Sequence, residues 1–301
     1  MMPPNGIQFF NRYTGKVETE VVYGEKWLRF ILFNPFGKLA LHAVAKRAWF
    51  SRWYGGRMSH HRSAAKVKPF IEQYKIAEAE HVKAAHEFTS FNDFFYRKLK
   101  PEARPVDAAI DSVVFPADGR HLGFAKASEV EGVFIKGQRF ELPKLLGDKK
   151  LAEQFADGAA VFSRLCPVDY HRFHFPVPGV PGEARLINGP LQSVNPLALR
   201  DRLDILWENK RFITKIETEK LGQVLVLEIG ATNVGSVNHT FVPTRSVAKG
   251  EEKGYFAFGG SATLTIFEPN RVKLAEDLLE NSSGQCELYA KVGDSMGVIV
   301  S

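Results

Sequence analysis

Residues 169–174 read Asp-Tyr-His-Arg-Phe-His and gather five polar side chains in one short stretch. Two histidines so close together indicate proton transfer, because a histidine titrates near neutral pH. Pro176 and Pro178 argue against a helix here, so the stretch is predicted to be extended. On a regular strand His171 and His174 point to opposite faces. We therefore expect the two histidines to contact different neighbours and to serve different steps.

A zinc site is a competing interpretation of the same histidines. It requires a third ligand, and no H-x-x-x-H or C-x-x-C spacing supplies one, so no metal is expected. Cys166 and Cys286 are the only cysteines, and they are expected to be free thiols in a reducing compartment. A purely structural alternative also stays open, with one hydrogen-bonded core histidine and one exposed histidine.

Gly259, Gly260 and Ser261 form a second candidate site, at the start of a predicted strand. Two glycines permit backbone angles closed to other residues, and they leave the Gly260 carbonyl sterically open. A serine hydroxyl directly after a strained, accessible carbonyl can attack it. The alternative is a hairpin with Ser261 in its turn. Asp118 lies after another predicted strand and is either a turn residue or a catalytic carboxylate.

The elements that must position these residues indicate an α+β fold. The periodicity predicts helices over 39–49 and 68–87 and a short helix from Ser90 to about Lys100, whose S-x-x-D start is typical of a helix N-terminus. Short β-branched and aromatic runs after residue 110 predict strands at 113–115, 133–135, 160–162, 224–227, 263–267 and 298–300. We expect a helical N-terminal layer, residues 1–108, on a β-rich, mainly antiparallel body, residues 109–301.

The charge is concentrated at the N-terminal end. Residues 1–105 hold 18 Lys and Arg against 9 Asp and Glu, while the whole chain has a net charge of +6. Such a region is expected to meet an anionic surface. No nucleic-acid-binding signature accompanies it, so nucleic acid is not expected as a partner. Residues 27–54 mix apolar, aromatic and basic residues, which is typical of a segment lying in a membrane interface. The alternative is a core-packing helix pair with a solvated basic face.

Nothing in the sequence predicts a transmembrane span or a secretory signal, because no apolar run approaches the ~20 residues that cross a bilayer. Any membrane association is therefore expected to be peripheral.

Taken together, these motifs resemble the phosphatidylserine decarboxylase family over nearly the whole chain. The D-Y-H-R-x-H element is specific, and the other matching stretches follow in the family's order. The matching stretches are Ser90-Phe91-Asn92-Asp93-Phe94-Phe95, Arg97-Lys98-Leu99-Lys100-Pro101, Arg104-Pro105, Pro116-Ala117-Asp118-Gly119, residues 169–176, Gly230-Ala231, Val234-Gly235-Ser236, Lys249-Gly250-Glu251 and Gly259-Gly260-Ser261.

The resemblance implies a carboxy-lyase that converts phosphatidylserine to phosphatidylethanolamine in phospholipid biosynthesis. Members of the family are zymogens that cut themselves at a Gly-Ser bond and turn the serine into a covalent pyruvoyl group, which forms a Schiff base with the substrate. Here the bond would be Gly260–Ser261, which gives chains 1–260 and 261–301. The pyruvoyl group would come from Ser261.

The resemblance also implies the roles of individual residues. Asp118, His174 and Ser261 would form the self-cleavage triad, and His171 would transfer a proton during decarboxylation. One departure is Ala262, which stands where the family commonly has Thr. Together with the basic N-terminal region, the resemblance implies peripheral attachment to the cytoplasmic face of a bacterial cell membrane. It leaves the oligomeric state open, a homo-oligomer included.

Two other functions fit part of this pattern. A pyruvoyl-dependent decarboxylase of a small soluble amino acid would use the same site but would need no basic, amphipathic region at 27–54. An uncleaved β-rich lipid-binding protein would need no cut at Gly260–Ser261. An intact-mass measurement separates the last alternative from both enzymes.

Overall fold

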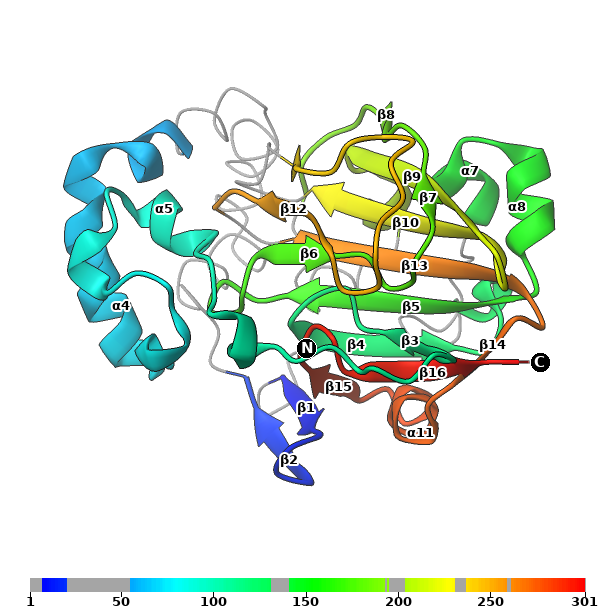
Figure 1. Cartoon of the computed structure of the whole chain (residues 1–301), viewed down its shortest axis with the longest axis horizontal. Helices are drawn as coiled ribbons and strands as arrows, with labels where there is room; N and C mark the ends of the chain where they lie inside the picture. The colour runs from blue at the N-terminus through cyan, green and yellow to red at the C-terminus, as the bar shows by residue number, and fades with distance from the viewer. Residues whose placement is uncertain are drawn as a thin grey trace, which may run out of the picture.

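The computed structural model describes residues 7–20, 55–130, 141–192, 194, 204–230, 237–258 and 261–300 (Figure 1). Its largest feature is a ten-stranded sheet. The strand order is β2 (Lys16–Thr19), β1 (Gln8–Asn11), β15 (Glu287–Ala290), β4 (Gly119–Phe124), β5 (Gly158–Leu165), β13 (Ser261–Pro269), β10 (Gly222–Gly230), β9 (Arg211–Thr218) and β7 (Val180–Pro181), and β8 (Arg185–Ile187) also pairs with β9.

The sheet is mainly antiparallel, as the sequence predicts. Only β1 and β15 run parallel among the paired strands that the structure describes. The expected α+β class is therefore confirmed.

Both faces of the central strands are covered, which is why β5 and β10 are almost continuously apolar instead of alternating. On one face, helices α7 (Leu142–Leu146), α8 (Lys149–Phe155) and α10 (Ile205–Glu208) pack into an apolar cluster with Phe162, Leu227 and Leu264. On the other face, helix α11 (Glu276–Ser283) joins a second cluster that contains Val161, Val226 and Phe267.

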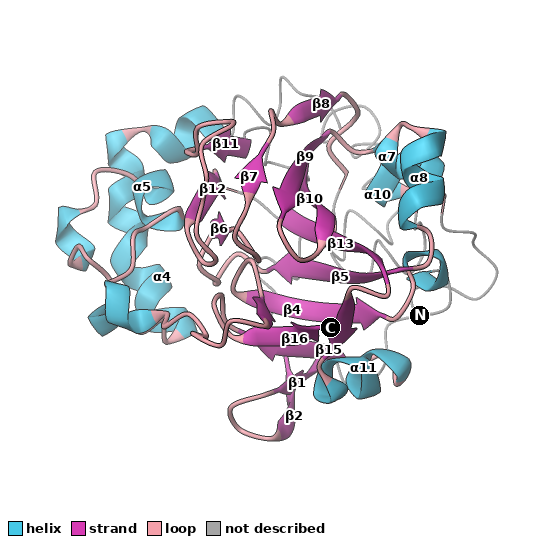
Figure 2. Cartoon of the chain, turned by 45° about the vertical axis from the view of Figure 1, so that its right-hand side comes forward, coloured by secondary structure: helices cyan, strands magenta, loops and turns pink. Residues whose placement is uncertain are grey.

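Two three-stranded sheets complete the β structure. One contains β11 (Val237–His239), β12 (Glu252–Phe256) and β6 (Arg172–His174), and the other contains β14 (Val272–Leu274), β16 (Ser295–Ile299) and β3 (Ser112–Val114). The first of them carries the histidine motif. Figures 1 and 2 place it at one end of the large sheet, beside helices α4 and α5.

The helical region is made of short pieces. They are η2 (His61–Lys66), α4 (Val67–Tyr74), η3 (Glu78–Glu80), η4 (Ala85–Glu87), α5 (Phe91–Phe95) and η5 (Pro101–Ala103), with η6 (Ala127–Val130) further along the chain. The predicted helix over 68–87 is wrong beyond Tyr74. Lys75 adopts the left-handed conformation, with a φ of 51°, and this ends α4 after two turns.

The short helix that begins after Ser90 is confirmed. The Ser90 hydroxyl accepts a hydrogen bond from the backbone N–H of Asp93 at 3.1 Å, the expected N-terminal cap. The helix ends at Phe95, earlier than the predicted end near Lys100. The residues that α5 buries, Phe91, Phe94 and Phe95, join an apolar cluster with α4.

Most of the predicted strands are present. Residues 113–115 correspond to β3, 160–162 to β5, 224–227 to β10, 263–267 to β13 and 298–300 to the end of β16. The predicted strand at 133–135 and the predicted helix over 39–49 lie outside the described residues. The hairpin of β1 and β2, which extends the large sheet, was not anticipated. No helix among the described residues is both long enough and apolar enough to cross a bilayer.

Candidate active site

Strands from distant parts of the sequence bring the candidate residues to one end of the large sheet. Ser261, the first residue of β13, lies between Leu165 at the end of β5 and Gly230 at the end of β10. Asp118 immediately precedes β4, the other neighbour of β5. Because antiparallel neighbours run in opposite directions, the starts of β4 and β13 meet the ends of β5 and β10.

The close approach of β4 to β5 requires glycine at position 119. A Cβ at this position would lie 2.5 Å from the backbone oxygen of Arg164, so only glycine lets β4 approach β5 so closely. The Asp118-Gly119 pair is therefore the entry to a buried strand, and Asp118 itself is only 2% exposed.

Arg104 and a backbone amide hold the Asp118 carboxylate. The Nε of Arg104 donates to both carboxylate oxygens at 2.9 Å, and its Nη2 donates to Oδ2 at 2.6 Å. The backbone N–H of Val292 donates to Oδ1 at 2.9 Å. No hydrogen bond joins Asp118 to His174 in the described residues. Asp118 is therefore a fixed negative charge, held by partners other than the histidine that the sequence led us to expect.

His174 is held as a neutral base. Its Nδ1 lies 2.9 Å from the Gly250 carbonyl oxygen, which can only accept, so Nδ1 carries the proton and Nε2 the lone pair. The Tyr170 hydroxyl lies 3.3 Å from Nε2. Burial lowers the pKa of His174 and outweighs the nearby negative charges of Glu252 and Asp118. His174 is consequently able to accept a proton at neutral pH.

A backbone contact places His174 near Asp118. The His174 N–H donates to the carbonyl oxygen of Pro116 at 2.7 Å, two residues before Asp118. The Asp118 charge also acts on the His174 ring. The two residues therefore share one electrostatic environment without a direct hydrogen bond.

His171 has a different set of contacts, as expected for a residue on the opposite face. It is fully buried, and its Nδ1 donates to the Asp169 carbonyl oxygen at 3.0 Å. Its ring packs on Phe95 with the centroids 3.8 Å apart, and Phe95 in turn contacts Phe258 at 4.9 Å. Phe258 precedes the Gly259-Gly260-Ser261 junction by one residue, so these aromatic contacts bring His171 towards that junction.

Ser261 is completely buried at the start of β13. Its hydroxyl makes no hydrogen bond to any residue that the structure describes. A buried hydroxyl without a hydrogen-bond partner is costly, because it has lost its bonds to water. The hydroxyl is therefore available for a reaction at its own peptide bond.

A small apolar cluster joins the chain neighbours of these residues. Ala117 precedes Asp118, Phe173 precedes His174, and Leu165 is the β5 partner of Ser261. All three pack together with Phe256 of β12. The packing fixes the histidine-bearing sheet against the end of the large sheet, where Ser261 lies.

Buried ion pairs hold the loop that carries the histidines. Nη1 of Arg120 donates to both carboxylate oxygens of Asp169, at 2.7 and 2.5 Å, and the Cys166 N–H donates to Oδ2 at 2.6 Å. The backbone carbonyl of this same Asp169 accepts from His171. No motif in the sequence points to Arg120, whereas Arg104 lies in one of the stretches that resemble the family.

The N-terminal hairpin is tied to β5, the strand that pairs with Ser261. Glu20, directly after β2, pairs with Nη2 of Arg164 at 2.6 Å, and Glu287 pairs with the same nitrogen at 2.5 Å. Burial tends to raise the pKa of Glu20, but Arg164 and Arg120 lower it to about 2. Arg164 therefore joins the first described residues of the chain to the strand beside Ser261.

A second buried ion pair joins the two sheets of the site. Nζ of Lys253 lies 2.6 Å from Oε1 of Glu228, and neither side chain is exposed. Lys253 falls where the pairing of β12 with β6 is irregular, between Glu252 and Gly254, so a β-bulge directs its side chain inward. Glu228 belongs to β10, two residues before Gly230, the partner of Ser261. The pair therefore links the histidine-bearing sheet to the large sheet.

Replacing Lys253 with Met is expected to lower the free energy of unfolding by about 3–5 kcal/mol, because Glu228 then remains buried without its cation. The double replacement of Lys253 with Met and Glu228 with Leu should recover most of this loss. Urea unfolding of the chain that also carries Ser261→Ala measures both, since every variant then stays one polypeptide.

The control is Lys126→Met, which breaks the exposed pair that Lys126 makes with Asp157 at 3.6 Å. That change should cost less than about 1 kcal/mol. A Lys253→Met chain as stable as its parent would show that the buried pair does not hold the two sheets together.

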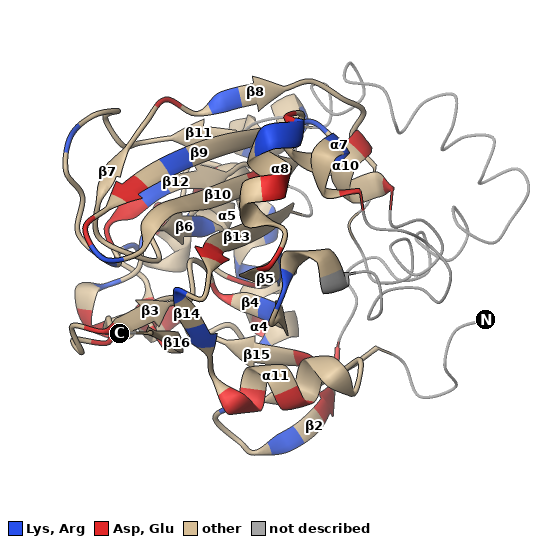
Figure 3. Cartoon of the chain, turned by 90° about the vertical axis from the view of Figure 1, so that its right-hand side faces the viewer, with Lys and Arg blue, Asp and Glu red and all other residues tan. Residues whose placement is uncertain are grey.

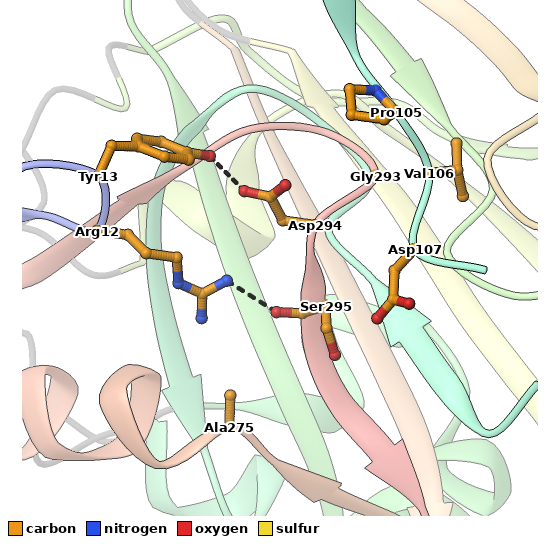
Figure 4. A pocket seen from close by; sticks show the side chains of 9 residues that line it. All are labelled: Arg12, Tyr13, Pro105, Val106, Asp107, Ala275, Gly293, Asp294 and Ser295. Atoms are coloured by element: carbon orange, nitrogen blue, oxygen red, sulfur yellow. Dashed lines mark hydrogen bonds between the residues drawn. The ribbon is translucent and has the colours of Figure 1, made fainter. Parts of the chain in front are cut away.

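The described residues contain no group of three His, Cys, Asp or Glu side chains placed to hold a metal ion. A surface pocket of about 680 Å³ is lined by Arg12, Tyr13, Pro105, Val106, Asp107, Ala275, Gly293, Asp294 and Ser295 (Figure 4). The Tyr13 hydroxyl donates to Asp294, and Arg12 donates to the Ser295 carbonyl at 2.8 Å. None of the four candidate catalytic residues lines this pocket.

Comparisons with known proteins point to a single family. Residues 91–298 match the family model described as phosphatidylserine decarboxylase. A protein of Fusobacterium nucleatum called phosphatidylserine decarboxylase proenzyme is 45% identical over 291 residues, 97% of each chain. Proteins with the same name from Chlamydia pneumoniae and Chlamydia muridarum are 44% and 45% identical, over 96% of each chain.

Proposed function

Because the chain belongs to the phosphatidylserine decarboxylase family, we propose that it is a carboxy-lyase that converts phosphatidylserine to phosphatidylethanolamine. We propose further that it is made as a zymogen and that its catalytic group is a pyruvoyl generated from Ser261. The observation that carries the proposal is the buried Ser261 hydroxyl without a partner, at the sheet end where neutral His174 and charged Asp118 also lie.

In the proposed self-cleavage, His174 takes the proton of the Ser261 hydroxyl through Nε2, after the Tyr170 hydroxyl has moved aside. The Ser261 oxygen then attacks the Gly260 carbonyl carbon and replaces the peptide bond with an ester. Asp118, held by Arg104, stabilises the positive charge that develops on His174. Loss of the Ser261 α-proton then releases Gly260 as a carboxylate, which gives chains 1–260 and 261–301. The dehydroalanine left at position 261 tautomerises to an imine, and water hydrolyses this imine to the pyruvoyl group with release of ammonia.

The pyruvoyl group, once formed, supplies an electron sink for the loss of CO₂. The protein supplies the surroundings. The buried position of Ser261 separates the reaction from bulk solvent, and we propose that His171 delivers the proton that replaces CO₂ on the substrate carbon. Phe95 and the Asp169 carbonyl oxygen fix the orientation of the His171 ring.

We propose that residues 1–108 form a membrane-facing region on a catalytic body of residues 109–301, peripheral to the cytoplasmic face of a bacterial membrane. The support is sequence charge, since residues 21–54 hold six Lys or Arg and one Glu. In the described body, basic and acidic residues are interspersed (Figure 3). Attraction to anionic lipid is worth about 1 kcal/mol per basic residue near the surface, and salt screens it.

The function is tested by intact mass and by product formation on vesicles that contain phosphatidylserine. We expect two chains, of 260 and 41 residues, the second blocked at its N-terminus, together with release of CO₂ and phosphatidylethanolamine. High salt should weaken vesicle binding and turnover without abolishing them, because the apolar residues near 27–33 are not screened.

Free serine is the control substrate. Turnover of free serine at the rate of the lipid would support the soluble amino-acid decarboxylase instead. A single uncut chain that binds the vesicles but releases no CO₂ would support the lipid-binding alternative.

A further inference from the structure

Arg97 is a buried cation. The other buried arginines of the described chain each have a carboxylate or several carbonyl oxygens as partners, and Arg97 does not. It is 5% exposed, and its Nε and Nη1 make no hydrogen bond to any described residue. Its one hydrogen bond to a described residue runs from Nη2 to the Val168 carbonyl oxygen at 3.2 Å. A guanidinium carries five N–H donors, so most of its hydrogen-bonding capacity is unused.

The other buried arginines show what is missing. Arg120, Arg164 and Arg172 each have a carboxylate oxygen within 2.8 Å of a guanidinium nitrogen. Arg211 has no carboxylate but donates to three backbone carbonyl oxygens. Burial lowers the pKa of Arg97 to about 10, and the nearest carboxylates offset this only in part. A buried charge without a counter-ion is costly, so binding of an anion beside Arg97 would be favourable.

The two carboxylates that act on Arg97 already pair with other arginines. Asp118 and Asp169 both act on Arg97 through charge, but Asp118 is bonded to Arg104 and Asp169 to Arg120. A further polar atom without a described partner lies in the same region, Nδ1 of His81, and the His81 ring and the Arg97 guanidinium both contact the Phe94 ring. The unused donors therefore belong to one small region next to Asp118.

The position of Arg97 relates it to the proposed reaction. It follows Phe95, the residue that packs on His171, by two positions. It also donates to Val168, in the loop that leads to both histidines. Arg97 and Ser261 are both buried, and Ser261 is the more deeply buried of the two. Whatever admits a substrate to Ser261 therefore brings it to the same end of the sheet as Arg97.

The planar fork of a guanidinium suits two classes of ligand, phosphate and carboxylate. The proposed substrate has both groups. Its carboxylate leaves as CO₂, and an ion pair to it would stabilise the ground state more than the transition state, which slows the reaction. Its phosphodiester keeps the same charge throughout, so binding it can hold the substrate without raising the barrier.

We propose, resting on the function proposed above, that Arg97 binds the phosphodiester of the lipid headgroup through its unused Nε and Nη1 donors. It is a substrate-binding residue, distinct from the residues of self-cleavage. Since no carboxylate among the described residues pairs with Arg97, removing its charge should not prevent folding or cleavage.

The test compares Arg97→Met and Arg97→Lys with the parent enzyme, using short-chain phosphatidylserine as substrate and short-chain phosphatidylethanolamine as inhibitor. Arg97→Met should cleave itself completely and keep the melting temperature of the parent. Its KM for the substrate and its Ki for the product should both rise by about 10- to 100-fold, the usual range for a charged hydrogen bond. Arg97→Lys should give KM and Ki values between those of the parent enzyme and those of Arg97→Met.

Arg211→Met is the matched control, since it also removes a buried arginine. It should lower the melting temperature, because three carbonyl oxygens lose their donor, and it should leave KM and Ki unchanged.

Any of four results would overturn the proposal. An unchanged Ki for the product would show that Arg97 does not contact the phosphodiester, and a rise in KM alone would assign it to the carboxylate. Inhibition of the parent enzyme by inorganic phosphate as strong as that by the lipid would indicate a site for free phosphate. Failure of both Arg97 variants to fold would show a structural role. A parent enzyme that is cleaved but inactive on phosphatidylserine would instead refute the proposed function.

Discussion

Replacing Ser261 with Ala is expected to leave the purified protein as one chain of 301 residues with no decarboxylase activity. The replacement removes the hydroxyl oxygen that we propose attacks the preceding carbonyl, and it removes the source of the pyruvoyl group. Its effect on folding should be small, because the hydroxyl has no hydrogen-bond partner to lose among the described residues. Intact mass and CO₂ release measure the two effects.

Thr263→Val is the matched control for this experiment. Thr263 lies two residues along the same strand, is also buried, and also has a hydroxyl without a described partner. The Val variant should be cleaved like the parent. Appearance of the 260- and 41-residue chains in the Ser261→Ala protein would place the cleavage chemistry elsewhere.

His174→Ala should slow self-cleavage by about 10²- to 10⁴-fold, the usual contribution of a general base. His171→Ala should still be cleaved but should lose a similar factor in turnover, because its proposed role begins only after cleavage. A time course of chain separation after refolding, followed by a turnover assay on the cleaved material, separates the two effects. Equal cleavage defects in both variants would contradict the division of roles.

The pH dependence of cleavage should carry the signature of His174. The neutral imidazole is the active form, and burial lowers its pKa below the ordinary value near 6.5. The cleavage rate should therefore be above half of its maximum at pH 6.5 and should fall as the pH drops through the lowered pKa. A rate already halved at pH 6.5 would indicate an unperturbed base.

The sequence was a good guide where local pattern decides the structure. Ser90 caps its helix as the motif predicts, and the apolar runs that became β5, β10 and β13 are long enough to identify without tertiary information. The helix predicted over 68–87 failed because periodicity does not reveal a left-handed residue such as Lys75. The hairpin of β1 and β2 was missed because its pairing with β15 joins residues nearly 280 positions apart, which no local pattern encodes.

The candidate site was predicted as residue types but not as a set of contacts. Motifs identify Asp118 and His174, whereas the partners that set their states, Arg104 and the Gly250 carbonyl oxygen, depend on how distant segments fold together. The direction of the side chain at position 262 also depends on how distant strands pair. Ala262 pairs with Ile229 and packs in the apolar cluster of the sheet face opposite the Ser261 side chain. On this backbone a hydroxyl at position 262 would point away from the Ser261 hydroxyl.

The strand order determines how the two chains of the cleaved protein would hold together. A cut before Ser261 would leave the shorter chain with β13 between β5 and β10, β15 between β1 and β4, and β16 between β14 and β3. The two products would therefore be interleaved, and neither could leave without dismantling two sheets, the ten-stranded sheet and the sheet of β14, β16 and β3. Once unfolded, they would have to find each other by diffusion, so recovery would depend on concentration, whereas the precursor folds as one chain. The mature form would persist through a slow unfolding rate, and its loss on heating would be irreversible.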